Sequence, residues 1–183
     1  MRKLKHHESK LLKKTNFFSW DAGQNIREGQ IVHRYQLSDR EDYGRYNKLA
    51  GTITALVSML RKLPSDDSDR IKMTEMLLDK LHAMGVIAMG KTLDECVNMS
   101  TSAFCRRRLS TVMVYNKFVQ RISEAAKLIE QGHVSVGVDV IKDPGMLVTR
   151  DMEDLIKWSE GSRVKRRVEE FKGVRDDFEM EGL

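Results

Sequence analysis

Apolar residues follow a helical period through the middle of the chain. Between Tyr46 and Leu60 they recur at steps of three and one, which places them on one face of a helix. Pro64 ends this helix because proline cannot donate the next backbone hydrogen bond. A second helix repeats the pattern from Ile71 and stops at Gly85. We expect the two helices to pack as an antiparallel hairpin.

Helix start signals precede three segments. Residues 38–41 (Ser-Asp-Arg-Glu) and 92–95 (Thr-Leu-Asp-Glu) have the spacing of a capping box, in which the first and fourth side chains satisfy each other's backbone amides. A later segment, 123–132, begins with a capping serine and ends at glycine. Its expected core face is Ala125, Leu128 and Ile129.

After this helix the period changes to two. Valines stand at 134, 136, 138 and 140, an alternation that predicts strands, and Gly137 marks the expected turn of a hairpin. Residues 143–145 (Asp-Pro-Gly) form a second break.

An arginine triplet, 106–108, stands before these elements and is followed by Leu109, Val112 and Met113 on one helical face. This division predicts that most of the guanidinium groups face solvent.

Composition restricts the class of protein. The 183 residues can form one ordinary domain or two small ones, and 40% apolar with 32% charged residues is typical of a globular protein. No apolar run approaches the roughly 18 residues of a membrane span, and the charged start lacks the apolar core of a secretion signal. Cys96 and Cys105 are expected to be reduced thiols of a nuclear or cytoplasmic protein.

Charge is unevenly distributed within a net value of +5. Residues 1–14 contain six Lys or Arg and one Glu, whereas residues 176–183 contain four carboxylates. The basic start is a candidate phosphate-binding arm, and RNA should repel the acidic end. The candidate contacts in the arm are Arg2, Lys3, Lys5, Lys10, Lys13 and Lys14.

Residues 106–109 (Arg-Arg-Arg-Leu), 123–134 (Ser-Glu-Ala-Ala-Lys-Leu-Ile-Glu-Gln-Gly-His-Val) and Asp143-Pro144 followed by Val148 resemble the alpha-L RNA-binding motif of the small-subunit ribosomal protein S4 family. The resemblance implies an α+β, mostly α fold, in which an N-terminal helical arm precedes two helices packed on a small antiparallel sheet. It implies four parts: a basic arm at 1–37, a helical region at 38–103, the RNA-binding domain at 104–160, and an extension with an acidic end at 161–183. The implied RNA contacts, with two neighbouring basic positions added, are Arg106, Arg107, Arg108, Lys117, Lys127, His133, Ser135, Lys142 and Arg150.

Residues 1–20, 41–43 and 148–154 are closer to one branch of this family, which belongs to the U3 small nucleolar ribonucleoprotein of the small-subunit processome. This resemblance implies a nucleolar, non-enzymatic assembly factor that promotes or stabilises pairing of U3 RNA with precursor ribosomal RNA during 18S rRNA processing. The implied partners are these two RNAs and other processome proteins. No cofactor, metal, membrane or DNA is expected.

Several alternatives remain open. A mature small-subunit ribosomal protein would have the same fold, and a protein-interaction adaptor could use the amphipathic arm. Residues 85–92 match the GxxxxGK[ST] pattern of a phosphate-binding loop, but that loop needs a preceding strand and the preceding segment is predicted to be helical. His133 could donate to a phosphate or cap a buried edge. Trp20 and Trp158 could stack on bases or, as we favour, pack in a core or against a partner.

Overall fold

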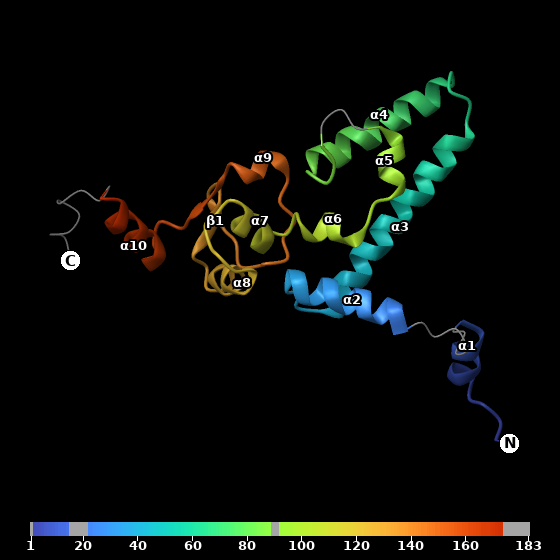
Figure 1. Cartoon of the computed structure of the whole chain (residues 1–183), viewed down its shortest axis with the longest axis horizontal. Coiled ribbons are helices and arrows are strands. Elements are labelled where there is room, and N and C mark those ends of the chain that lie inside the picture. Colours follow the sequence, from blue (N-terminus) through green and yellow to red (C-terminus); the bar gives the residue numbers. More distant parts are fainter. Residues whose placement is uncertain (1, 15–21, 89–91, 174–183) are drawn as a thin grey trace. The chain divides into compact units, whose positions relative to one another are not determined.

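The computed structural model describes residues 2–14, 22–88 and 92–173. The chain divides into two compact units, Met1–Arg34 and Tyr35–Leu183. The described helices and strands (Figure 1) are α1 (His6–Lys14), α2 (Ala22–Tyr35), α3 (Arg40–Lys62), α4 (Ser68–Ala83), α5 (Leu93–Val97), α6 (Thr101–Cys105), α7 (Leu109–Tyr115), α8 (Ile122–Glu130), β1 (Val134–Val136), β2 (Asp139–Val140), α9 (Arg150–Glu153), β3 (Ile156–Trp158) and α10 (Arg163–Lys172). Predominant helix with one small sheet confirms the predicted α+β, mostly α fold.

Helices α3 and α4 form the hairpin that the apolar spacing predicts. Helix α3 ends at Lys62, and Leu63 before Pro64 is extended, as expected for a residue that precedes proline. Figure 1 shows α4 returning beside α3 with α5 between them. Their common core is formed by one fully buried residue from each helix: Val57, Leu81 and Cys96.

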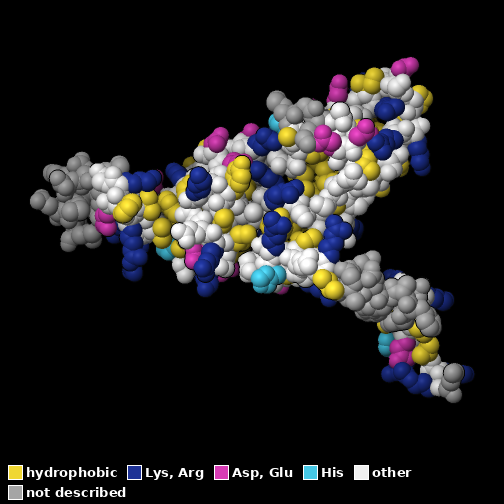
Figure 2. All heavy atoms as spheres, viewed as in Figure 1, with side chains coloured by type: hydrophobic (Ala, Val, Ile, Leu, Met, Phe, Trp, Pro, Cys, Tyr) yellow, Lys and Arg dark blue, Asp and Glu magenta, His cyan; other side chains and the backbone are white. Residues whose placement is uncertain are grey.

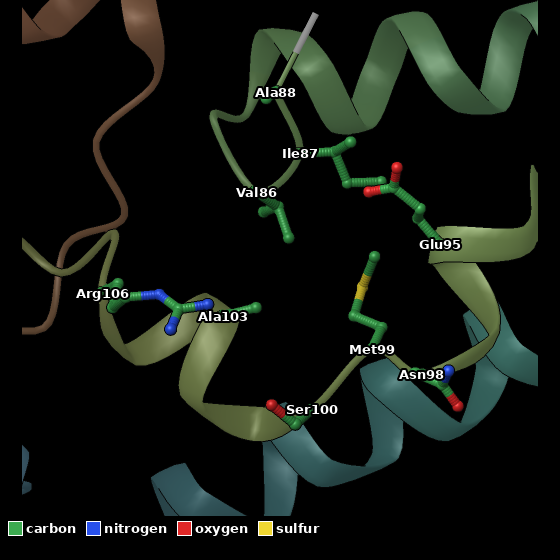
Figure 3. A pocket seen from close by; sticks show the side chains of 9 residues that line it. All are labelled: Val86, Ile87, Ala88, Glu95, Asn98, Met99, Ser100, Ala103 and Arg106. Atoms are coloured by element: carbon green, nitrogen blue, oxygen red, sulfur yellow. The ribbon is translucent and has the colours of Figure 1, made fainter. Parts of the chain in front are cut away.

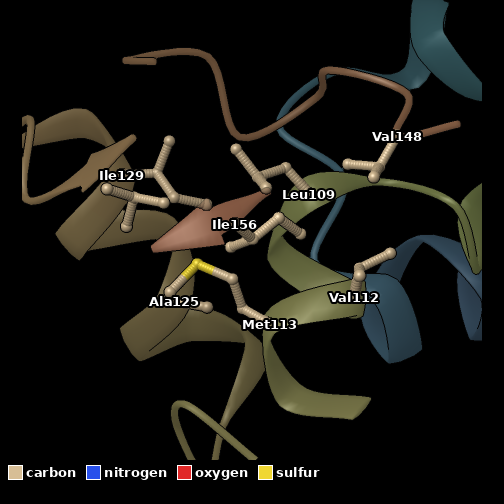
Figure 4. Close-up of a cluster of buried hydrophobic side chains, with 8 residues drawn as sticks. Leu109, Val112, Met113, Ala125, Ile129, Val148 and Ile156 are labelled. Carbon is tan, nitrogen blue, oxygen red and sulfur yellow. The ribbon is translucent and has the colours of Figure 1, made fainter. Parts of the chain in front are cut away.

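A second core lies between the small sheet and the helices α7 and α8. Figure 4 shows side chains of both helices meeting β3 and the segment before α9. The predicted helix faces are buried here, with Ala125 and Ile129 inaccessible to solvent and Leu128 half-buried. The cluster contains Leu109, Val112, Met113, Ala125, Ile129, Val134, Val148 and Ile156.

Helix α8 ends in a glycine turn that leads directly into the sheet. Gly132 has φ +76°, a conformation that glycine adopts without steric cost. The amide of His133 donates to the carbonyl of Leu128, and the amide of Gly132 donates to that of Ile129, which completes a Schellman motif. The glycine stop predicted at the end of this helix is therefore confirmed.

The sheet has the strand order β2-β1-β3, and both pairs are antiparallel. Val136 pairs with Asp139, so Gly137 and Val138 form the two-residue turn. Gly137 has φ +64°, which confirms it as the turn residue, and Val138 at the tip is 95% exposed. The valine alternation therefore predicts the strands but not a common buried face.

Two predicted helix starts are wrong by one or two residues. The N-cap of α3 is Asp39 rather than Ser38, because Asp39 is extended and the helix begins with Arg40. The N-cap of α8 is Arg121, and Ser123 lies inside the helix. Inclusion of Ile122 places it three and seven positions before Ala125 and Ile129, on the buried face. Thr92 is the N-cap of α5 as predicted, although its side chain makes no capping hydrogen bond.

Candidate nucleic-acid interface

The arginine triplet links α6 to α7, and its three members have different surroundings. Arg106 is the C-cap of α6 and is exposed, Arg107 is half-buried, and Arg108 is the buried N-cap of α7. The expectation that most of these guanidinium groups face solvent is therefore wrong for two of the three. Both of these are paired with carboxylates from distant parts of the chain.

Arg108 is 2% exposed and belongs to the junction between α3 and α7. Its Nη1 donates to Asp42 Oδ2 at 3.0 Å and to the Tyr46 hydroxyl at 3.1 Å, and its guanidinium carbon lies 5.9 Å from the centre of the Tyr46 ring. Tyr46 in turn stacks on Phe104 with ring centres 6.1 Å apart. Burial raises the pKa of the Tyr46 hydroxyl, although the charge of Arg108 opposes this shift.

Arg107 ties α7 to α9. Its Nη1 lies 2.9 Å from Glu153 Oε2, while Nε and Nη2 donate to the Val148 carbonyl at 3.0 and 2.9 Å. The guanidinium lies against Gly85, where an added Cβ would come within 2.7 Å of Arg107 Cζ. Every nitrogen of this guanidinium already has an acceptor, so the group is a structural connection in the folded chain.

Arg106 lines a shallow hollow between the segment after α4 and the short helices α5 and α6. Figure 3 shows its guanidinium beside Ala103, with Glu95 on the opposite wall. The remaining lining residues are Val86, Ile87, Ala88, Asn98, Met99 and Ser100. An exposed guanidinium at the rim of a mixed polar and apolar hollow is available to an anion.

Arg150, also predicted to contact RNA, bonds to backbone carbonyls across the same junction. Its Nε donates to the His82 carbonyl at 3.0 Å and its Nη2 to the Ile87 carbonyl at 2.9 Å. These carbonyls belong to the last turn of α4 and the segment after it. The His82 carbonyl also accepts from the Gly85 amide at 2.8 Å, so Arg150 adds a second donor there. Its side chain remains exposed.

The predicted contacts in and around the hairpin also include both buried and exposed side chains. Ser135 is 3% exposed and its hydroxyl donates to the Lys157 carbonyl at 3.4 Å, so this side chain serves the β1–β3 pair. His133 is half-buried, with Nδ1 3.0 Å from the Ser162 hydroxyl. Lys142 is exposed, and its Cε would lie 3.7 Å from a Cβ on Gly132. Of these three predicted contacts, Lys142 is the cation that reaches solvent.

Lys117 and Lys127 are exposed, at the end of α7 and on α8. Neither side chain makes a hydrogen bond or ion pair within the described chain. Sequence reasoning overlooked other exposed cations of this kind, among them four arginines in the C-terminal part of the chain. Arg121 precedes α8, and Arg163, Arg166 and Arg167 stand on α10.

The predicted basic arm begins in the first unit. Its cations are all exposed, and α1 buries no residue. Arg2 pairs with Glu8 at 2.7 Å, and this hydrogen bond lowers the pKa of the Glu8 carboxyl. The five lysines of the arm, Lys3, Lys5, Lys10, Lys13 and Lys14, therefore carry most of its available positive charge.

The distribution of charge over the second unit is mixed. Figure 2 shows Lys and Arg side chains over α6, over the neighbouring part of α3 and beside α10, with carboxylates between them. The exposed members of the predicted set in this unit are Arg106, Lys117, Lys127, Lys142 and Arg150. The geometry therefore reduces the set of exposed candidates by the two paired arginines, the buried serine and the half-buried His133.

The remaining sequence patterns are the phosphate-loop match and the two tryptophans. Helix α4 precedes residues 85–92 in place of the strand that a phosphate-binding loop needs, and residues 89–91 lie outside the described part. Trp158 packs edge-on against Phe118 with ring centres 5.7 Å apart, whereas Trp20 and the acidic end at 176–183 lie outside the described residues. Over the described residues no group of three or more His, Cys, Asp or Glu is arranged to hold a metal ion. The described helices include none with the length and apolarity of a membrane span.

Comparison with known proteins places this geometry in a family. The model of the "Ribosomal protein S4/S9 N-terminal domain" matches residues 3–106, and the "S4 domain" model matches residues 107–154. The chain is 44% identical over 182 residues to "U3 small nucleolar ribonucleoprotein protein IMP3" of Homo sapiens, covering 99% of both chains. It is also 44% identical over 181 residues to the protein of that name from Saccharomyces cerevisiae, covering 98% of this chain and 99% of the relative.

A ribosomal relative is more distant. "Small ribosomal subunit protein uS4" of Hyperthermus butylicus is 33% identical over 152 residues, which cover 82% of this chain and 85% of that protein. The S4 domain match begins at Arg107 and takes in α7, α8, the hairpin and α9. The chain therefore belongs to the ribosomal protein S4 family and, within it, to the group of U3 small nucleolar ribonucleoprotein proteins named IMP3.

Proposed function

We propose that this chain is an RNA-binding component of the U3 small nucleolar ribonucleoprotein and acts as a non-enzymatic assembly factor in ribosome biogenesis. It holds U3 RNA and promotes or stabilises the pairing of that RNA with precursor ribosomal RNA during 18S rRNA processing. Its partners are these RNAs and other processome proteins, and its place of action is the nucleolus.

One observation carries this proposal: the S4 domain match coincides with the unit that presents unpaired lysines. Lys117 follows the end of α7, Lys127 lies on α8 and Lys142 follows the hairpin, all within residues 107–154. Lysines without a carboxylate partner are suited to contacting phosphates. Near full-length similarity to the two IMP3 relatives supports the same particle for this chain.

The proposed division of labour keeps the four parts expected from the sequence. Residues 104–160 bind RNA, residues 1–37 supply a basic arm, residues 38–103 form a helical support, and residues 161–183 form an extension. The pairing of Arg107 and Arg108 changes which side chains bind. The lysines of the S4 unit, which we define as residues 107–154, take the role that the sequence assigned to the whole arginine triplet, together with Arg106.

The test is binding of the full chain to a U3 RNA fragment, measured by fluorescence anisotropy over a series of salt concentrations. If about ten phosphates are neutralised on partly single-stranded RNA, log affinity should fall against log salt with a slope of roughly −7. Replacement of Lys117, Lys127 and Lys142 by Gln should weaken binding on the order of tenfold and make the slope less negative by about 2. Unchanged affinity in a variant with a native circular dichroism spectrum would contradict the proposed surface.

The pairing role needs its own readout. With donor and acceptor dyes on a U3 fragment and a complementary precursor fragment, the chain should raise the rate or the extent of duplex formation. The lysine variant should lose this effect in proportion to its loss of RNA affinity. Tight RNA binding with no effect on pairing would restrict the function to RNA retention.

The uS4 similarity favours a second candidate, a protein that remains in the mature small subunit. Sedimentation of cell extracts distinguishes the two. An assembly factor should be found with large precursor particles and be absent from translating ribosomes, whereas a mature ribosomal protein should follow the polysome fractions.

A further inference from the structure

Helix α10 lies outside the residues matched by either family model, which end at 154. It is nevertheless a well-delimited helix. The Ser162 hydroxyl accepts a hydrogen bond from the Val164 amide at its start, and Gly173 with φ +64° ends it. Because both ends of this helix are capped, its helical spacing decides which side chains share a face.

One face of α10 carries three arginines. Arg163, Arg166 and Arg167 are three and four positions apart, the spacing that places side chains side by side on a helix. All three are exposed, and none of their guanidinium groups makes a hydrogen bond or ion pair within the described residues. Glu170, which already has an interaction, shares this face.

The opposite face of α10 forms one wall of a groove. Lys165, Val168, Glu169 and Lys172 line a groove together with Phe118, Ile156, Lys157, Trp158 and Glu160. Within this wall Lys165 lies 3.6 Å from Glu169. Because the two sets differ by about half a turn of the helix, the arginines are directed away from the groove. In Figure 2, Lys and Arg side chains stand out from the surface beside α10.

The helix begins next to the S4 hairpin. The Ser162 hydroxyl lies 3.0 Å from His133 Nδ1, and the Ser159 amide donates to the His133 carbonyl at 2.9 Å. Lys142 lies beside Gly132, the residue before His133. Arg163 therefore directly follows a residue that contacts His133, and Lys142 lies beside the glycine before His133. The arginine face of α10 thus begins close to Lys142.

An aromatic ring adjoins the arginines. Phe171 is 94% exposed and stands four positions after Arg167, on the side of α10 next to the arginine face. Guanidinium groups bind phosphate oxygens in a bidentate manner, and exposed aromatic rings stack on unpaired bases. A lipid surface would also attract a basic helix with an exposed aromatic ring, but the adjoining S4 domain match favours RNA as the partner of this face.

We propose that the arginine face of α10 is a second RNA-binding surface, which grips the phosphate backbone of the RNA held by the S4 unit and stacks Phe171 on an unpaired base. This inference rests on the proposed RNA-binding function and extends it beyond the S4 domain. The surface reads no sequence, because its contacts are phosphates and the faces of bases.

The test uses the full chain and an RNA hairpin with an unpaired flanking segment, in the anisotropy assay. Replacement of Arg163, Arg166 and Arg167 by Gln should weaken binding on the order of tenfold and make the salt slope less negative by about 2. The matched control removes three cations from the groove side, with Lys157, Lys165 and Lys172 replaced by Gln, and should change affinity less than about threefold. Equal effects of the two triple variants would overturn the proposal.

Two further measurements sharpen the result. Phe171→Ala should weaken binding to the RNA with unpaired bases by at least about fivefold and leave binding to a blunt duplex unchanged, as expected for lost stacking. Vesicles of phosphatidylcholine and phosphatidylserine provide the other source of phosphate. Vesicle binding that depends on the three arginines, with RNA affinity unaffected by their loss, would overturn the proposal in favour of a membrane surface.

The failures of the two proposals are distinguishable in this assay. If the S4 lysine variant binds normally while the α10 arginine variant does not, the proposed surface of Lys117, Lys127 and Lys142 is wrong. Helix α10 is then the binding element. If the lysine variant loses affinity while the arginine variant binds normally, the α10 proposal is wrong.

Discussion

At the residue scale, Arg108 shows how a basic side chain in an RNA-binding domain can serve the fold. Its guanidinium is almost completely buried and contacts Asp42 and Tyr46 of α3, whereas its Nε has no hydrogen-bond partner. A buried charge is stable only with its partners, because removal from water costs more than any single hydrogen bond returns. Arg108 thus joins α3 to the S4 unit.

Replacement of Arg108 by Ala should destabilise the protein by about 2–3 kcal/mol, because it removes two hydrogen bonds and leaves a cavity at the junction. The Asp42 carboxylate keeps a second partner, because its Oδ1 lies 3.4 Å from Arg45 Nη1. Arg45→Ala is the matched control: it removes an exposed arginine from the same carboxylate and should cost less than about 1 kcal/mol. Urea unfolding measures both variants.

A native-like free energy of unfolding for Arg108→Ala, together with a large loss of RNA affinity, would contradict this assignment. It would restore Arg108 as the RNA contact expected from the sequence. The exposed neighbour Arg106 provides an internal reference, because its replacement should affect RNA binding without affecting stability.

At the element scale, the end of α4 is fastened to the S4 unit by two arginines. Arg150 donates to carbonyls at the end of α4 and after it, and Arg107 lies against Gly85 while it binds Glu153. These contacts join elements that belong to the two different family models. The helical region and the S4 unit are therefore coupled through backbone acceptors as well as through apolar packing.

Gly85 is a position of this junction at which a side chain would be both strained and crowded. It has φ +69°, and an added Cβ would lie 2.7 Å from Arg107 Nε, whose guanidinium is held by Val148 and Glu153 and cannot easily move. We expect Gly85→Ala to destabilise the protein by about 2–3 kcal/mol. Gly51→Ala in α3 is the control, because nothing lies within 4 Å of its added Cβ.

The control substitution should act in the opposite direction. Alanine in an exposed helix interior is favoured over glycine, so Gly51→Ala should stabilise the protein by about 0.5–1 kcal/mol. Urea unfolding of both variants decides the matter. Equal effects would show that the close approach of Arg107 to Gly85 does not constrain the junction.

At the scale of the whole molecule, positive charge is divided between the first unit and the S4 region. Deletion of residues 2–14 removes a net charge of +5 without removing any buried residue of α1. If this segment is a phosphate-binding arm, deletion should make the slope of log RNA affinity against log salt less negative by about 3 and leave the melting temperature unchanged.

A variant with the same thirteen residues in scrambled order separates charge from structure in this experiment. It should keep the salt slope of the native chain, because phosphate neutralisation depends on the number of cations. A slope unaltered by the deletion would show that the basic start takes no part in RNA binding.

The local elements could be predicted because their signals are local. Pro64 ends α3, Gly132 and Gly137 end α8 and form the hairpin turn, and the apolar faces of α7 and α8 form the core of the S4 unit. Helix α10 carries the same kind of signal, a capping serine, a closing glycine and arginines at helical spacing. Its arginine face could have been predicted by the same reasoning.

The sequence by itself determined the fold class, most helix and strand positions and, through residues that match the S4 family, the kind of molecule that this chain binds. Only the tertiary structure decided which cations remain available. Arg108 meets a carboxylate 66 residues away, Arg107 one 46 residues away, and Arg150 a carbonyl 68 residues away. Helical periodicity tells which face of a segment a side chain occupies. The partner of a long charged side chain depends on which distant segment folds against that face.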